Sequence, residues 1–274
     1  LEAGPVSALS LCLHLSPCGG PPLCGPPPFL ATRPEKREKE LKCVPSVDII
    51  KLCGSLLYTR PPFRLRRRPM AKIIAIVNQK GGVGKTTTTV NLTAALAALG
   101  KRVLLCDFDP QANTTSGFGV DKTTASPSIY DVLIDGADCR KAIVPTQWAD
   151  VIPANKALAG ATVEMIGIDH REYLLKNALE PFREEYDYIF IDCPPSLELL
   201  TLNALCAADT VMVPVQCEYY ALEGLSDLLS TIRIVKRSLN QAIDLEGVVL
   251  TMYDGRTNLS MQVAEEVKLS LIHI

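Results

Sequence analysis

The sequence predicts a doubly wound α/β domain with a mostly parallel sheet. Short β-branched runs alternate with helical segments, a glycine-rich turn joins the first such run to a helix, and acidic residues end two later runs. The chain has 274 residues, of which 47% are hydrophobic and 21% charged, with a net charge of −2. This length suffices for one sizeable α/β core or two modest domains, and it excludes a disulfide mini-protein and a fully disordered chain.

Residues 1–69 differ in composition from the rest of the chain. They hold 12 of the 20 prolines, 5 of the 10 cysteines, and 11 basic against 5 acidic residues, so their charge is +6 and the remainder carries −8. Because they show no sustained helical or strand period, we expect a disordered or non-native upstream segment. One alternative is a secretory signal around residues 9–15, although no basic stretch precedes it. Another is a nucleic-acid-binding arm, whose phosphate contacts would be Arg64, Arg66, Arg67 and Arg68.

The last six residues, 269–274, are also expected to be non-native. They correspond to the codons CTG-TCT-CTT-ATA-CAC-ATC, which resemble a transposase end sequence used in sequencing libraries. A short hydrophobic helix end is the alternative. The folded domain is therefore expected to occupy residues 70–268.

Within this domain the predicted strands and helices alternate. The strands are predicted at residues 73–77, 103–106, 150–152, 188–191, 211–215 and 248–252. The helices are predicted at residues 86–99, 171–184, 197–207 and 222–237. Such alternation is typical of βα units around a parallel sheet, and no apolar run reaches the ~20 residues that a membrane span needs. The five cysteines of this part are expected to be inert core thiols in a reducing cytoplasm.

A glycine-rich turn follows the first strand and opens the first helix. Its residues are Lys80, Gly81, Gly82, Val83, Gly84, Lys85, Thr86 and Thr87. Glycines allow backbone N–H groups to face phosphate oxygens, and the helix N-terminus adds partial positive charge there. We expect Lys85 to bridge the β and γ phosphates of a nucleotide, and Thr86 to offer its hydroxyl to Mg²⁺. An ordinary loop is the alternative, but the order of strand, glycines, Gly-Lys-Thr and helix favours a phosphate loop.

Three acidic residues follow predicted strands. Asp107 and Asp109 lie at the strand edge where α/β folds bind ligands, and Asp192 ends the run 188–191. We expect Asp192 to hold Thr86 or a Mg²⁺-bound water, and Asp107 to support Mg²⁺ or the loop geometry. Capping of the next turn is the alternative for the first pair. Cys193 has no suitably spaced second cysteine, so we expect a structural thiol rather than a cluster ligand.

The general phosphate-loop pattern would place glycine where Gln79 stands, whereas this chain has Lys-Gly-Gly-Val-Gly-Lys-Thr. This is a deviant form of the Walker A motif. With it, residues 70–268 resemble the ParA/Soj family of chromosome- or plasmid-partitioning ATPases, relatives of MinD and the nitrogenase iron protein. Segments 214–225 and 250–258 are also similar to Soj-type sequences. The resemblance implies a P-loop NTPase fold. It also implies that the family's last helices would follow residue 268, so we expect the domain to be truncated at its C-terminus.

The resemblance also implies roles for single residues. Lys80 would reach across a nucleotide-sandwich dimer to the partner's phosphates, with a solvated surface lysine as the alternative. Asp109 would position the attacking water, and Arg256 would bind DNA without sequence preference. Because the charge of residues 70–274 is negative, we expect dimerisation to create the local basic patch that meets DNA.

These expectations combine into one function. The chain would be a Mg²⁺-dependent ATPase that dimerises with ATP and binds nonspecific double-stranded DNA. A ParB-type centromere-binding protein would stimulate hydrolysis and so release the ATPase from DNA. Repeated binding and release would segregate a chromosome or plasmid. The expected location is the bacterial cytoplasm, at the nucleoid. The alternatives are a MinD-like membrane-associated positioning ATPase and a non-hydrolysing nucleotide-binding regulator in which Asp109 is only structural.

Overall fold

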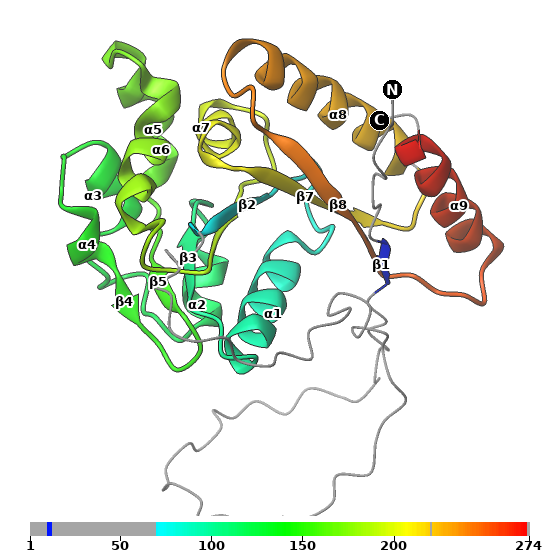
Figure 1. Ribbon diagram of the computed structural model, residues 1–274, viewed down its shortest axis with the longest axis horizontal. Coiled ribbons are helices and arrows are strands. Elements are labelled where there is room, and N and C mark those ends of the chain that lie inside the picture. Colours follow the sequence, from blue (N-terminus) through cyan, green and yellow to red (C-terminus); the bar gives the residue numbers. More distant parts are fainter. Residues whose placement is uncertain (1–9, 13–69, 220, 273–274) are drawn as a thin grey trace, which may run out of the picture. The chain divides into compact units, whose positions relative to one another are not determined.

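The computed structural model describes residues 10–12, 70–219 and 221–272. They form one eight-stranded sheet in the order β1-β8-β7-β2-β6-β3-β5-β4, with helices on both faces (Figure 1). Every neighbouring pair is parallel except β4 and β5, which are antiparallel. The predicted fold class, a doubly wound and mostly parallel sheet, is confirmed.

All six predicted strands are present, with small shifts at their ends. The strands are β1 (Ser10–Cys12), β2 (Lys72–Ile76), β3 (Val103–Asp107), β4 (Val144–Pro145), β5 (Asp150–Ile152), β6 (Tyr188–Asp192), β7 (Thr210–Gln216) and β8 (Asp244–Thr251). Strands β1 and β4 were not predicted, because two or three residues are too few to show a period. The prediction for residues 1–69 otherwise lies outside the described residues.

The four predicted helices are found, but one of them is interrupted. The α-helices are α1 (Lys85–Ala98), α2 (Asn113–Gly117), α3 (Ile129–Leu133), α4 (Cys139–Ala142), α5 (Leu158–Glu164), α6 (Leu174–Leu179), α7 (Leu199–Ala207), α8 (Ala221–Ser238) and α9 (Asn258–Ile272). The 3₁₀ turns are η2 (Met165–Gly167), η3 (Arg171–Tyr173) and η4 (Glu180–Phe182). The segment predicted as a single helix over residues 171–184 is therefore η3, α6 and η4, and Pro181 lies in the first turn of η4. Helix α9 continues past residue 268, while the origin of residues 269–274 stays a prediction.

The sheet separates two hydrophobic clusters. Successive residues of β2 alternate between them: Ile73 and Ala75 belong to the larger cluster, and Ile74 and Ile76 to the smaller one. Helix α1 covers the smaller cluster through Leu92 and Leu96. A parallel strand buried on both faces has little freedom to shift, so the carboxyl end of β2, where the glycine-rich loop begins, is held firmly.

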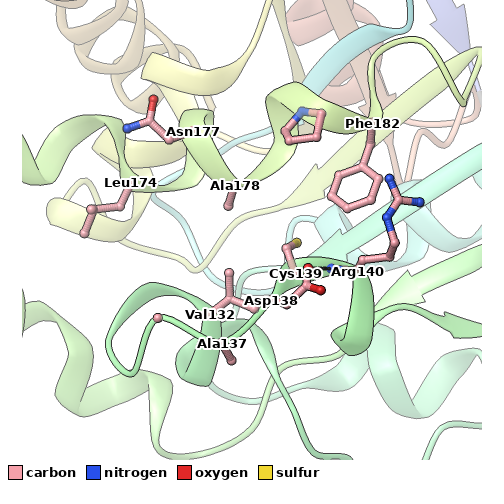
Figure 2. A pocket seen from close by; sticks show the side chains of 11 residues that line it. Val132, Ala137, Asp138, Cys139, Arg140, Leu174, Asn177, Ala178 and Phe182 are labelled. Carbon is pink, nitrogen blue, oxygen red and sulfur yellow. Dashed lines mark hydrogen bonds between the residues drawn. The ribbon is translucent and has the colours of Figure 1, made fainter.

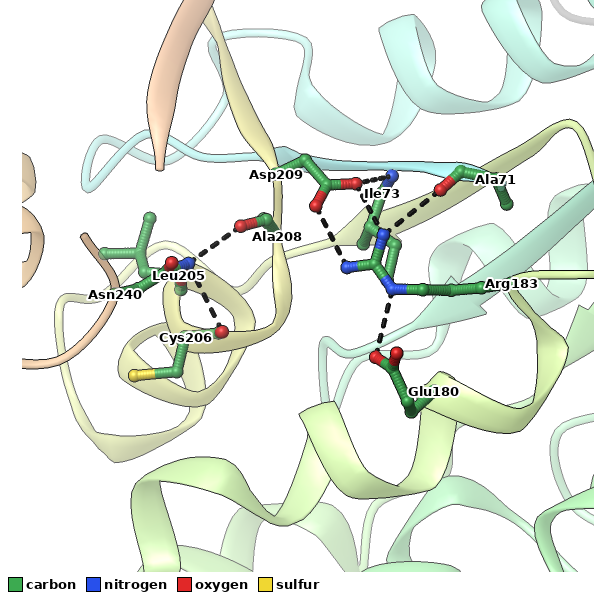
Figure 3. Close-up of polar contacts among 9 residues, drawn as sticks. All are labelled: Ala71, Ile73, Glu180, Arg183, Leu205, Cys206, Ala208, Asp209 and Asn240. Atoms are coloured by element: carbon green, nitrogen blue, oxygen red, sulfur yellow. Dashed lines mark hydrogen bonds and ion pairs between the residues drawn. The ribbon is translucent and has the colours of Figure 1, made fainter. Parts of the chain in front are cut away.

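Arg183 joins the amino ends of β2 and β7, at the opposite edge of the sheet (Figure 3). Its Nη1 and Nη2 donate to the two carboxylate oxygens of Asp209 at 2.9 Å each, and Nη1 also donates to the Ala71 carbonyl at 3.2 Å. Asp209 in turn accepts from the Ile73 N–H at 2.8 Å. Nearby, the Asn240 amide donates to the carbonyls of Leu205 and Ala208 at the end of α7. These contacts stabilise the amino-terminal ends of the strands, which lie opposite the glycine-rich loop.

The structure also shows where the cysteines lie and whether any helix could span a membrane. The five cysteines of the domain, Cys106, Cys139, Cys193, Cys206 and Cys217, are all buried, as expected for core thiols. Among the helices of residues 70–219 and 221–272, none is both long and apolar enough to cross a membrane.

Candidate functional site

The glycine-rich loop joins β2 to α1 in a conformation that requires glycine. Gly82 has φ +75° and Gly84 has φ +88°, the left-handed region that side chains with a Cβ rarely adopt. A Cβ placed on Gly81 or Gly82 would meet no other atom within 4 Å, so the outer side of the loop is open. At Gly84 a Cβ would approach the Thr251 methyl to 3.3 Å. The loop therefore presents an open backbone surface at the N-terminus of α1.

Two long-range hydrogen bonds and one local hydrogen bond hold this loop. The buried Asn78 amide donates to the Pro214 carbonyl at 2.7 Å, and its oxygen accepts from the Lys80 N–H at 2.9 Å. The Thr251 hydroxyl donates to the Val83 carbonyl at 2.8 Å. Asn78 and Thr251 were not predicted as site residues, because partners this far apart in sequence leave no local pattern.

Lys85 is the first residue of α1 and is only 7% exposed. Its ammonium donates to the Lys80 carbonyl at 3.0 Å, which turns the side chain back over the loop. Burial lowers the pKa of Lys85, while the charges of Asp192, Cys193 and Asp109 oppose that shift. A buried cation at a helix N-terminus is well suited to pair with a phosphate anion.

Asp192 accepts hydrogen bonds from three threonines. Its Oδ2 accepts from the hydroxyl of Thr86 at 2.8 Å and from that of Thr114, and its Oδ1 accepts from the Thr89 hydroxyl at 3.2 Å. Burial raises the pKa of Asp192, and these threonine bonds lower it in part. The predicted pairing of Asp192 with Thr86 is thus present in the structure, and it joins the end of β6 to the start of α1.

Asp107 is fully buried and holds the segment that carries Asp109. One carboxylate oxygen accepts from both the N–H and the hydroxyl of Thr115 at 2.7 Å, and the other accepts from the Asp109 N–H at 3.2 Å. These contacts favour support of the loop geometry, one of the two roles expected for Asp107. Asp109 itself is half-buried, and its Oδ1 accepts from the Gln111 N–H at 2.9 Å.

Asp107 gives the chain a pH-dependent stability. Burial first, and then the charge of Asp192, raises the pKa of Asp107 from 3.8 to about 7. Between these values the folded chain binds a proton that the unfolded chain releases, so this group's contribution to stability is present at low pH and is lost as pH rises toward 7. We expect the Asp107→Asn variant to lack this contribution. Urea unfolding without nucleotide or Mg²⁺, at pH 5 and pH 7.5, checks this: equal pH dependence in parent and variant would contradict it.

Lys80 lies on the exposed part of the loop and forms an ion pair with Glu218, which follows β7 in the same chain. Its ammonium is therefore paired within the single chain. A role toward a partner's phosphates would require Lys80 to leave Glu218, and this role stays a prediction.

Arg256 lies in the loop between β8 and α9, with its side chain 87% exposed. Its Nε and Nη2 donate to the two carboxylate oxygens of Asp254 at 2.9 and 2.7 Å. The guanidinium is therefore open to solvent, but its positive charge is paired with an acidic neighbour.

The carboxyl ends of β2, β3 and β6 thus bring together the glycine-rich loop, Asp107, Asp109 and Asp192. In the part of the chain that the structure describes, no three His, Cys, Asp or Glu side chains gather as a metal cluster. Mg²⁺ does not need one, because it is usually held by one or two carboxylates together with substrate phosphates and water. The Thr86 hydroxyl beside the Asp192 carboxylate supplies the hard oxygen atoms that this ion prefers.

A pocket of about 350 Å³ lies elsewhere, between the α3–α4 segment and α6–η4 (Figure 2). Its lining includes Cys139, Arg140, Asn177 and Phe182, and no residue of the glycine-rich loop. The Arg140 guanidinium lies 5.1 Å from the Phe182 ring centre and forms an ion pair with Glu185. Its charge is therefore already balanced within the chain, and the pocket takes no part in the site at the loop.

Comparisons with known proteins identify relatives of this chain. Residues 71–245 match the family described as AAA domain. The chain is 60% identical over 201 residues to the sporulation initiation inhibitor protein Soj of Bacillus subtilis, covering 73% of this chain and 79% of that protein. It is 52% identical over 201 residues to the chromosome partitioning protein ParA of Myxococcus xanthus, covering 73% of this chain and 71% of that protein.

A solved structure is also similar, that of cobyrinic acid a,c-diamide synthase from Mycobacterium smegmatis with a bound ATP analog and magnesium. The TM-score is 0.70 at 42% identity, and the match covers 72% of this chain and 82% of that one. Identity to Soj and to ParA is higher than to this synthase. The chain therefore belongs to the ParA/Soj family of P-loop ATPases.

Proposed function

We propose that this chain is a Mg²⁺-dependent ATPase that dimerises around ATP, binds nonspecific double-stranded DNA and partitions a chromosome or plasmid. The main support for the proposal is that buried Lys85 and the hydrogen-bonded pair Thr86–Asp192 lie at the same open glycine-rich loop. This arrangement offers a cation, backbone donors and hard oxygen atoms within one short segment. A polyphosphate bound to a metal ion requires all three.

Each group at the loop has a distinct task in this proposal. The N–H groups of residues 81–84 and the Lys85 ammonium bind the phosphates, and Thr86 and Asp192 hold Mg²⁺ or its water. The metal ion, when bound, neutralises charge on the β and γ phosphates. Asp107, which we had also predicted near the metal, holds the loop of Asp109 through Thr115 and the Asp109 N–H.

Asp109 orients the attacking water in this proposal. It is the half-buried acid closest in sequence to the carboxyl end of β3, and its charge acts on Lys85. Lys80 of a second copy, once released from Glu218, adds positive charge at the phosphates during transfer. Dimerisation and hydrolysis are thereby linked.

The proposed partners are DNA and a ParB-type centromere-binding protein, and the proposed location is the cytoplasm, at the nucleoid of a bacterium. Support comes from identity to Soj and ParA, whose names denote sporulation control and chromosome partitioning. ATP turnover, measured alone, with DNA and with both DNA and the partner, tests the function. Turnover that rises only with both supports it. A MinD-like enzyme would respond to lipid vesicles instead, and a non-hydrolysing regulator would show no turnover in any condition.

The Arg256→Glu substitution is expected to weaken DNA binding without abolishing ATP-dependent dimerisation. The exposed guanidinium is replaced by a second acid beside Asp254, which repels DNA phosphates on both protomers of a dimer. DNA binding at saturating ATP should fall about tenfold, and its dependence on salt should become less steep.

The matched control is Lys141→Glu, which makes the same charge change on α4, beside the last strand at the other end of the sheet. It should leave DNA affinity near the parental value. Equal affinity of the parent and Arg256→Glu would remove Arg256 from the DNA site. Loss of dimer mass in Arg256→Glu would place this residue at the interface between protomers instead.

A further inference from the structure

We propose that Thr251 is a positioning residue that shapes the glycine-rich loop for nucleotide and links it to residues 252–257, the loop that carries Arg256. The inference rests on the proposed nucleotide site. It adds to that site a residue from β8, which is separated from β2 in the sheet by β7. It gives a physical route by which the state of the nucleotide site reaches a separate surface loop.

The Thr251 hydroxyl is the first part of this link. Thr251 ends β8, is 9% exposed and donates to the Val83 carbonyl at 2.8 Å. Val83 is 1% exposed, so its carbonyl has little access to water that could replace this donor. A buried carbonyl that loses its partner is destabilised, and the loop around it is expected to move to restore a hydrogen bond.

The Thr251 methyl group is the second part. It lies 3.3 Å from the position that a Cβ on Gly84 would occupy. Gly84 has φ +88° and directly precedes Lys85, the first residue of α1. Thr251 therefore bonds Val83 through its hydroxyl and occupies, with its methyl group, the space that a side chain at Gly84 would need. The hydrogen bond to Val83 holds the backbone donors just before Lys85, and the methyl group fills space beside Gly84.

The backbone after Thr251 forms the third part. The Thr251 carbonyl accepts from the Cys217 N–H at 3.2 Å, which keeps this residue aligned with the end of β7. The next residue, Met252, has φ +53° and is 56% exposed. A non-glycine residue holds this conformation only where its surroundings fix it, and the fixed neighbour here is Thr251. A shift of Val83 is thus passed through Thr251 to the start of the Arg256 loop.

Nucleotide binding to the full chain tests the first half of the proposal. Thr251→Val removes the hydroxyl and keeps the branched shape, whereas Thr251→Ser keeps the hydroxyl and removes the methyl group. We expect Thr251→Val to weaken binding of a non-hydrolysable ATP analogue with Mg²⁺ about fivefold and to raise KM more than it lowers kcat. Thr251→Ser should stay within about twofold of the parent.

Hydrogen exchange of residues 252–257, with and without saturating analogue and Mg²⁺, tests the second half. The parent and Thr251→Ser should show a nucleotide-dependent change in exchange over this loop, and Thr251→Val should show none even when fully bound. If the Thr251→Val chain does not fold, Thr251→Ala takes its place with the same expectations.

The outcomes separate this inference from the proposed function. Parental affinity and a parental exchange change in Thr251→Val would overturn the inference alone, and so would equal losses in the valine and serine variants. Absence of nucleotide binding by the parent chain would overturn the proposed function, and the inference with it.

Discussion

Replacing Lys85 by alanine is expected to remove nearly all ATP binding. The ammonium is buried at the N-terminus of α1 and donates to the Lys80 carbonyl, within the loop that faces the phosphates. No other lysine or arginine among the described residues is as buried, so its charge has no substitute. Loss of a charge-assisted pair of this kind corresponds to about a 100-fold fall in affinity.

Isothermal titration with ATP and Mg²⁺ measures this effect. Lys101→Ala is the matched control, because Lys101 is exposed beyond the other end of α1. The control should bind as the parent does. Unchanged affinity in Lys85→Ala would refute the assignment of the glycine-rich loop as the phosphate site.

Replacing Asp109 by alanine is expected to separate binding from hydrolysis. The side chain follows β3 and accepts a hydrogen bond from the Gln111 N–H, not from Lys85, Thr86 or Asp192, so its loss leaves these three residues in place. ATP affinity should stay within about threefold of the parent, since the phosphate contacts remain. Turnover should fall about 100- to 1000-fold, because water is no longer oriented.

Single-turnover hydrolysis at saturating ATP checks this prediction, with Asp135→Ala as the control. Asp135 is an exposed acid just after α3, away from the loop. Parental hydrolysis by Asp109→Ala would assign Asp109 a structural role and favour the non-catalytic alternative.

The fold was predictable because its signals are local. Short, mostly apolar runs that contain several isoleucines, such as those of β2 and β6, identify strands of a parallel sheet. The glycines and Gly-Lys-Thr likewise identify the loop from a few consecutive residues. Helices α2 to α5 escaped prediction because one or two turns are too short to show a helical period.

The site's supporting residues could not be predicted in the same way. Thr114 holds Asp192 from 78 residues away in sequence, and Thr115 holds Asp107 from 8 residues away, which is further than any helical or strand period reaches. The Thr251 contact with Val83 joins segments 168 residues apart. Such partners are chosen by the arrangement of the sheet rather than by local spacing. For Asp107 the sequence left two roles open, support of the loop and a direct role at the metal ion. Its contacts with Thr115 and the Asp109 N–H favour support of the loop.

The central claim is that ATP bound at the glycine-rich loop controls assembly and DNA binding. Co-measurement of dimer mass and DNA binding by the Asp109→Ala chain, with ATP, with ADP and without nucleotide, tests it most directly. The account predicts a stable dimer that binds DNA with ATP, and a monomer that binds DNA weakly in the other two conditions. Equal mass and equal DNA binding in all three conditions would contradict it.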